Sequence, residues 1–180
     1  MRSNNSDTPN WFQAMNGPYS REFTEALDVE HETLKSIEAW DKVKRTPNMN
    51  VLKSTWAFKV KRFPSGLIKS FKARFCVRGD MQIEGVDFHE TYAPVANWTT
   101  IRTLLVLSIQ LGLCTAQLDY LAAFPQENLD EEVYVEMPRG YKEPGHVYKL
   151  KKSLYGLRQS PKNFFDHISE QLHSLGFTPS

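Results

Sequence analysis

One aspartate in the sequence could bind a metal ion. Asp119 ends the short apolar run 114–119 (CTAQLD) and is followed by Tyr120 and then by Leu-Ala-Ala-Phe at 121–124. If this run is a strand of the core, the carboxylate leaves the sheet at its end and meets solvent, where hard oxygen ligands bind divalent cations. The alternative is that Asp119 caps a short helical turn over 121–124, which needs no metal. Taken by itself, the position favours the capping role.

A second group of residues could bind phosphate. Two segments, 55–63 and 67–78, alternate apolar with basic residues and are predicted to be strands. The turn between them, Phe-Pro-Ser-Gly at 63–66, favours a type I turn, so the two segments form a hairpin. Alternation places several cations on one face, among them Lys61, Arg62, Lys72 and Arg74. Guanidinium forks match phosphate oxygens, but the same pattern also suits a solvated face with no ligand.

A third candidate is the turn before the last predicted helix. Tyr155 and Gly156 precede a helix that begins at Ser160-Pro161. A backbone without a side chain beside an aromatic ring allows the close approach of a planar base. The alternative is a tight turn with a packed tyrosine, and this motif alone favours that alternative.

Composition excludes several other kinds of protein. With 41% hydrophobic and 24% charged residues, the 180-residue chain is globular and of the size of one domain or part of one. Its two cysteines are too few for a disulfide scaffold or a four-cysteine zinc site. The sequence contains no Walker A loop, no Gly-x-Gly-x-x-Gly fingerprint, no signal peptide and no run long enough to span a bilayer. We therefore expect an intracellular protein with no membrane partner.

Net charge conceals a segmental pattern. The chain is +1 overall, yet residues 51–80 hold eight basic groups against one acid, and residues 81–136 hold nine acids against one base. A basic block of this kind suits a polyanion such as nucleic acid or a triphosphate. The acidic block suits metal ions or simple charge balance.

The remaining elements must position these groups. We expect residues 1–20 to be a disordered tail and residues 82–98 to be irregular. Apolar spacing predicts helices at 21–40, at 99–111 and after Ser160, the second of them buried. In the last helix, Ser160 is the expected cap, the stripe runs from Phe164 to Leu175, and Gly176 ends it. Further strands are predicted at 114–119, 132–136 and 146–150.

Taken together, these segments resemble the reverse transcriptase of copia-type (Ty1/copia) LTR retrotransposons, from about Trp40 to Phe177. Seven blocks occur in order and at the spacing of that family: WAFKVKR (56–62), KARFCVRGDMQ (72–82), GVDFHETYAPV (85–95), IRTLLVLS (101–108), QLDYLAAF (117–124), LDEEVYVEMPRGY (129–141) and YKLKKSLYGLRQSP (148–161). Any one block could arise by chance. The ordered set is a specific signal.

The resemblance implies an α+β right-hand polymerase fold. The fingers would span about 40–110 and a partial palm about 111–180 of a domain covering 21–180. The implied reaction is dNTP addition to a primer 3′-hydroxyl on an RNA or DNA template, with two Mg²⁺ ions. The implied partners are template-primer, dNTPs and the rest of a polyprotein, in the cytoplasm or a virus-like particle.

The resemblance also implies roles for single residues. Asp119 corresponds to the first catalytic carboxylate, the Tyr120 carbonyl to a further metal ligand, and Phe124, beside Ala123, to the aromatic ring that excludes a ribose 2′-hydroxyl. The residues implied for the triphosphate are Arg74 with Lys61 or Arg62, and those for the template-nucleotide pair are Tyr155 and Gly156. Further nucleic-acid contacts would come from Lys59, Lys72 and Arg78.

One departure from the family pattern is large. The family's second motif, Tyr-x-Asp-Asp, supplies two more carboxylates, and this sequence contains no Asp-Asp pair. We therefore expect a fragment that stops before that motif and is inactive alone, because one carboxylate cannot hold two divalent ions. The alternatives are a non-catalytic remnant that binds nucleic acid, or a product with no retained function whose apolar surface is bare.

Overall fold

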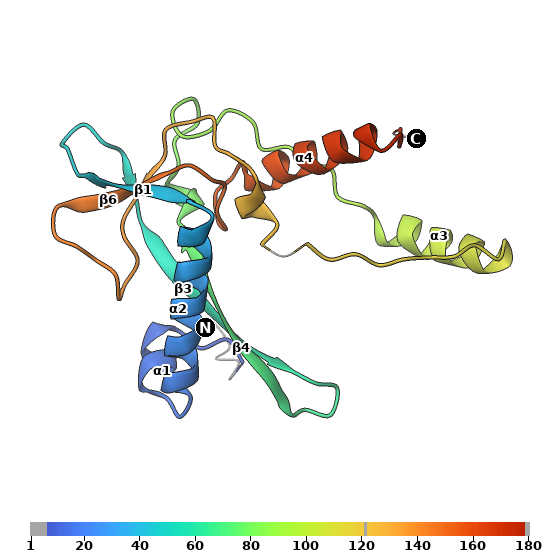
Figure 1. Ribbon diagram of the computed structural model, residues 1–180, viewed down its shortest axis with the longest axis horizontal. Helices are drawn as coiled ribbons and strands as arrows, with labels where there is room; N and C mark the ends of the chain where they lie inside the picture. The colour runs from blue at the N-terminus through green and yellow to red at the C-terminus, as the bar shows by residue number, and fades with distance from the viewer. Residues whose placement is uncertain (1–6, 121, 179–180) are drawn as a thin grey trace.

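The computed structural model describes residues 7–120 and 122–178, which form two small β-sheets with helices around them (Figure 1). This mixed α+β composition is consistent with a reverse transcriptase domain. In chain order the elements are α1 (Trp11–Asn16), α2 (Ser20–Ser36), β1 (Trp40–Lys44), β2 (Val51–Leu52), β3 (Ser54–Arg62), β4 (Ile68–Val77), the 3₁₀ turn η1 (Gly79–Met81), α3 (Trp98–Gln110), the 3₁₀ turn η2 (Phe124–Gln126), β5 (Tyr134–Val135), β6 (His146–Leu150) and α4 (Ser160–Ser174).

The predicted hairpin is confirmed as the antiparallel pair β3–β4. Its turn closes with a hydrogen bond from the Gly66 N–H to the Phe63 carbonyl, and Gly66 has a φ of +84°, which glycine adopts without strain. Trp56, Phe58 and Val60 are buried on one face, while Lys59 and the other residues between them are exposed on the opposite face. Period-two alternation therefore sets which side chains remain in water.

A four-stranded sheet in the order β1-β6-β5-β2 forms the other half of the fold. Strands 132–136 and 146–150 were predicted, and β5 and β6 confirm them, β5 in shortened form. β1 was not predicted, because 21–40 was expected to be one helix; instead α2 ends at Ser36 and Trp40 begins a strand. The cause is a long-range pairing in which Trp40 lies opposite Leu150 and its ring stacks on Tyr148 at 4.4 Å.

The main core lies between α2 and the two sheets, and α2 runs beside the hairpin (Figure 1). Phe23, Leu27 and Leu34 of α2 are buried, as their helical spacing predicts. On the sheet side, Phe75 is fully buried and contacts Trp40 edge-to-face at 5.8 Å. The helix thus covers the apolar face of the hairpin and leaves its basic face open.

The expected disorder of residues 1–20 is wrong for the part that the structure describes. Residues 1–6 lie outside the described residues, but α1 follows at Trp11–Asn16. A capping box joins Asn10 and Gln13, and Ala14 is fully buried. The polar composition of this segment reflects its caps and turns and not a lack of structure.

Two core predictions are also wrong. The helix 99–111 exists as α3, but none of its residues is buried, and it lies at the end of an extended arm in Figure 1. Residues 114–119 form no strand, and Leu118 is 88% exposed. Apolar composition indicates that burial would stabilise a segment. It does not indicate whether the rest of the chain offers a surface against which the segment can be buried.

The last helix is confirmed with two corrections. Pro161 lies in its first turn and Gly176 follows its end with a φ of +89°. The N-cap is Gln159 and not Ser160, whose hydroxyl donates to the carbonyl of Leu154 at 2.7 Å. Leu172 and Leu175 of the predicted stripe are exposed.

Within the described residues, no helix is both long and apolar enough to span a membrane.

A buried histidine is expected to make the stability of the fold depend on pH. His31 is 8% exposed, stacks on Tyr141 at 3.8 Å and lies 3.1 Å from the Tyr148 hydroxyl. Burial lowers the pKa of His31 below its usual 6.5, so the unfolded chain binds more protons than the folded chain in this range. We expect the melting temperature to fall as pH drops below about 6.5, where the unfolded state gains a proton.

Thermal unfolding of the wild type and His31→Gln, each at pH 7.5 and 5.5, tests this expectation. The substitution should remove the His31 part of the decrease. The exposed His173, changed to Gln in the same way, is the control and should leave it intact. Equal pH dependence in wild type and His31→Gln would contradict the assignment.

Candidate functional site

A cavity of about 600 Å³ opens on the basic face of the hairpin. Its walls come from β3, β4, the segment around Asp119, the turn at Tyr155 and the N-terminal part of the chain. The lining residues are Thr8, Glu30, Ala57, Phe58, Lys59, Lys61, Lys72, Ala73, Arg74, Asp119, Tyr120, Ala122 and Tyr155. The structure therefore brings together the three candidate groups that the sequence presents separately: the aspartate, the cations and the tyrosine.

The cations of the cavity share one face of the hairpin because of its register. Lys59 pairs with Lys72, Ala57 with Arg74 and Lys61 with Ser70. Within residues 7–120 and 122–178, none of the four cations makes an ion pair. Four positive charges without a direct ion-pair partner, against two carboxylates in the lining, produce a potential that attracts polyanions.

Arg74 is the best-positioned of these cations. Its guanidinium carbon lies 4.8 Å from the centre of the Tyr155 ring. Tyr155 in turn contacts Phe124 edge-to-face at 5.3 Å, and Phe124 contacts Phe164 of α4 at 6.0 Å. Stacking on a supported ring restricts the guanidinium plane and leaves its N–H groups free to donate to phosphate oxygens.

Asp119 lines the cavity from an exposed, extended segment and not from a core strand. Its neighbour Tyr120 contacts Phe164 edge-to-face at 5.5 Å, which holds this segment against α4. No group of three or more His, Cys, Asp or Glu side chains comes together in the described part of the chain. An exposed carboxylate with an adjacent backbone carbonyl fits an Mg²⁺ ion that takes its other ligands from water and phosphate.

Arg62, predicted near the triphosphate, and Arg78, predicted to contact nucleic acid, are both paired with other groups. Arg62 donates to the Asp7 carboxylate from Nε and Nη2, and also to the Gly66 carbonyl. Arg78 makes a forked pair with Asp80 at 2.7 and 2.6 Å. The guanidinium groups lower the pKa of Asp7 and of Asp80, so both pairs stay ionised. The structure places neither arginine in the cavity.

Three further predicted residues lie behind the cavity wall. Phe124 and Ala123 are half-buried and do not line the cavity; Phe124 supports Tyr155 instead. Gly156 has a φ of +91°, and a Cβ built on it would lie 2.2 Å from the Val77 carbonyl oxygen. The space that a side chain would occupy therefore holds the backbone of β4 and not a planar base, so the role of Gly156 is to let the turn pack.

A buried polar network fixes this turn to the loop after η1. Gln82 donates to the Gln159 side chain at 2.9 Å and accepts from the Arg158 N–H at 2.8 Å. Gln159 donates to the Asp87 carbonyl at 2.8 Å. Sequence reasoning missed the network, because amide side chains more than 70 residues apart give no local pattern.

Sequence reasoning also missed the second acidic residue of the cavity, beside Asp119. Glu30 comes from α2, a helix that was expected only to pack. A signal was present: Glu30 follows Phe23 by seven residues and so falls on the same helical face as Leu27 and Leu34. A carboxylate on an apolar stripe requires a polar environment, and here the cavity provides it.

The sequence of the chain matches a known protein family and several of its members. Residues 37–180 match a family model described as reverse transcriptase (RNA-dependent DNA polymerase). The chain is 36% identical over 156 residues, 85% of its length, to the retrovirus-related Pol polyprotein from transposon TNT 1-94 of Nicotiana tabacum. It is 34% identical over 145 residues to that from transposon RE1 of Arabidopsis thaliana, covering 78% of this chain.

Similarity extends to yeast and covers a small part of each relative. The transposon Ty1-DR4 Gag-Pol polyprotein of Saccharomyces cerevisiae is 28% identical over 155 residues, 83% of this chain. The matches cover 12%, 10% and 9% of the tobacco, Arabidopsis and yeast polyproteins, so the chain spans about a tenth of these relatives. No solved structure matches the chain significantly.

Proposed function

The chain belongs to the reverse transcriptase family of copia-type retrotransposon Pol polyproteins, and from this premise we propose that its cavity is the nucleotide-binding part of the polymerase site. The observation that carries the proposal is that Arg74, three lysines and Asp119 line one cavity. Cations on one wall suit a triphosphate, and a carboxylate on the other suits the metal that accompanies it.

This proposal assigns subdomains to the elements. The hairpin and residues 40–110 would be the fingers of a right-hand polymerase, and residues 111–180 part of its palm. The partners would be template-primer, dNTPs and the remainder of a Pol polyprotein. The setting would be the cytoplasm or a virus-like particle.

The chain's own residues would bind and orient the nucleotide. Arg74 donates its fork to the phosphates from a fixed plane on Tyr155, and Lys59, Lys61 and Lys72 increase the local concentration of the polyanion. Asp119 and the Tyr120 carbonyl would hold Mg²⁺, which in this family activates the primer 3′-hydroxyl and neutralises phosphate charge. Phe124 would act indirectly by supporting Tyr155.

A binding titration with dTTP, with and without Mg²⁺, tests the proposal. We expect the wild-type chain to bind dTTP, and Asp119→Asn to lose the gain from Mg²⁺ while keeping metal-free binding. We also expect no primer extension on poly(rA)/oligo(dT), because the 180 residues contain no Asp-Asp pair to complete a two-metal site. Clear dTTP incorporation by this chain would contradict that part.

A second candidate function is the holding of nucleic acid without chemistry. It is favoured by the exposed face of the hairpin, on which Lys59, Lys61 and Lys72 make no ion pair within the described residues. Phosphate contacts release counterions, so this function requires steeply salt-dependent oligonucleotide binding. Such binding in a chain that does not bind dTTP would select the second function over the first.

A further inference from the structure

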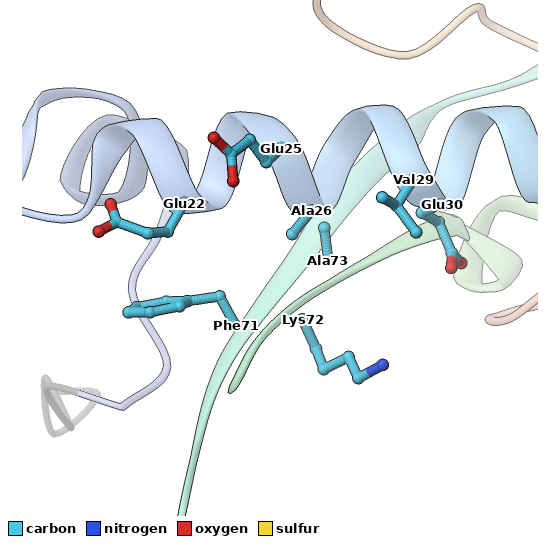
Figure 2. Close-up of a pocket in the computed structure, with 8 residues that line it drawn as sticks. All are labelled: Glu22, Glu25, Ala26, Val29, Glu30, Phe71, Lys72 and Ala73. Carbon is cyan, nitrogen blue, oxygen red and sulfur yellow. The ribbon is translucent and has the colours of Figure 1, made fainter. Parts of the chain in front are cut away.

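Glu30 connects two hollows of the molecule. A groove of about 300 Å³ lies between α2 and β4. Figure 2 shows Glu22 at one end of it and Glu30 at the other, with the Lys72 side chain extending toward the Glu30 side. Glu30 lines the nucleotide cavity as well, whereas Glu22 and Glu25 do not. Glu30 belongs to the segment before residue 37, outside the region that the family model covers. The family match therefore assigns it no role.

The carboxylate of Glu30 lies beside β4, with Lys72 and Ala73 in the same groove. Its Oε1 atom is buried and has no hydrogen-bond partner among the described residues, and the nearby backbone of Phe75 acts to lower its pKa. Glu30 also makes no ion pair within 4 Å in that part of the chain. The negative charge is therefore not cancelled by direct contact and acts through space.

The charged groups that act on Glu30 also line the cavity. Burial raises the pKa of Glu30, while Lys72 and Arg74 on β4 act in the opposite direction. Glu30 in turn acts to raise the pKa of Cys76 and of Tyr155. The other charged groups that face the cavity are Lys59 and Lys61 from β3 and Asp119 from the segment opposite.

We propose that Glu30 is a specificity-determining residue that disfavours metal-free polyphosphate in the cavity. Its charge offsets that of Lys72 and Arg74 and repels an anion in proportion to the charge of that anion. Binding of a divalent ion removes two negative charges from a triphosphate, so the magnesium complex is repelled less than the free anion. The inference rests on the proposed nucleotide function and adds a selection for the metal-bound form.

The test compares Glu30→Gln with Glu22→Gln, a matched change on the same helix and in the same groove but outside the cavity. Inorganic triphosphate is titrated at pH 8, with and without Mg²⁺, by calorimetry. We expect Glu30→Gln to bind metal-free triphosphate about three- to tenfold more tightly, with a smaller gain in Mg²⁺, as expected for removal of one nearby charge. Glu22→Gln should change neither affinity.

Cys76 provides a readout that needs no ligand. In a Cys114→Ser background, Cys76 is the remaining thiol, and burial raises its pKa to about 11. Removing the Glu30 charge should increase the thiolate fraction and hence the alkylation rate by iodoacetamide at pH 8.5. Glu22→Gln should leave the alkylation rate unchanged.

The two readouts separate the possible failures. A Glu30→Gln variant that resembles Glu22→Gln in both triphosphate affinity and alkylation rate overturns the inference. A gain in affinity as large in Mg²⁺ as without it overturns the selection for the metal-bound form. If the wild type binds no triphosphate, the proposed nucleotide function fails, and faster alkylation in Glu30→Gln still supports the placement of its charge at the cavity.

Discussion

Replacement of Gly156 by alanine is expected to destabilise the folded chain by more than about 3 kcal/mol, because two separate penalties combine. The new Cβ would lie 2.2 Å from the Val77 carbonyl oxygen, an atom of the backbone that cannot rotate away. The φ of +91° adds strain for any residue with a side chain. Both penalties fall at the contact where the turn meets β4.

Both Val77 and Gly79 pack tightly against the turn at Tyr155 and Gly156. The Val77 N–H donates to the Tyr155 carbonyl at 2.8 Å, and a Cβ on Gly79 would lie 2.0 Å from the Gly156 carbonyl oxygen. Moving the turn to relieve the clash would therefore break a backbone hydrogen bond and shift Tyr155. Because Arg74 stacks on that ring, residual folded protein should also bind dTTP more weakly.

Gly140 is the matched control. It has a similar φ of +97°, but a Cβ built on it meets nothing within 4 Å. Gly140→Ala should therefore cost only the backbone strain of about 1–2 kcal/mol. Chemical denaturation monitored by tryptophan fluorescence would measure both variants. An equal loss of stability in the two would show that the approach to Val77 is not the cause.

Arg74→Ala is expected to weaken dTTP binding by about tenfold to a hundredfold, the range for losing a charge-assisted bidentate contact. Arg74 is exposed and makes no ion pair among the described residues, so its removal should leave the melting temperature nearly unchanged. Arg74→Lys keeps the charge but loses the planar fork, and we expect it to recover only part of the affinity.

Arg62→Ala is the control for a general effect of charge. Arg62 lies on the same hairpin, but its guanidinium is neutralised by Asp7. Its removal should change the dTTP affinity by less than about threefold, since an exposed, paired charge contributes little. Isothermal titration would compare the three variants. Equal losses for Arg62→Ala and Arg74→Ala would mean that dTTP responds to overall charge and not to a site.

Much of the local structure could be read from the sequence. Alternation at 55–63 and 67–78 specified the hairpin and which face carries Lys59, Lys61, Lys72 and Arg74, because side chains of a strand point alternately to its two faces. The strand at 146–150 and the glycine after α4 could also be predicted, because both depend on residues close together in the sequence. The seven ordered blocks identified the family, which the comparisons confirm.

Other features depended on which surfaces meet. Ser160 has the residue type of a cap, yet its hydroxyl donates to Leu154. Arg62 and Arg78 have the chemistry of phosphate ligands, yet they bind Asp7 and Asp80. Residue type determines which hydrogen bonds and ion pairs a polar side chain can form. Which partner it binds depends on the groups that the folded chain places next to it.

What the sequence determined by itself is therefore the periodic elements, the family and the basic face, all of which depend on neighbours along the chain. Only the tertiary structure decided that Trp40 begins a strand, that α3 is exposed, that Glu30 lines the cavity on the hairpin, and that Gly156 lets the Tyr155 turn pack behind it. Each of these depends on contacts between segments far apart in sequence. Such contacts form only where folding brings complementary surfaces together, and they cannot be predicted from the spacing of residues along the chain.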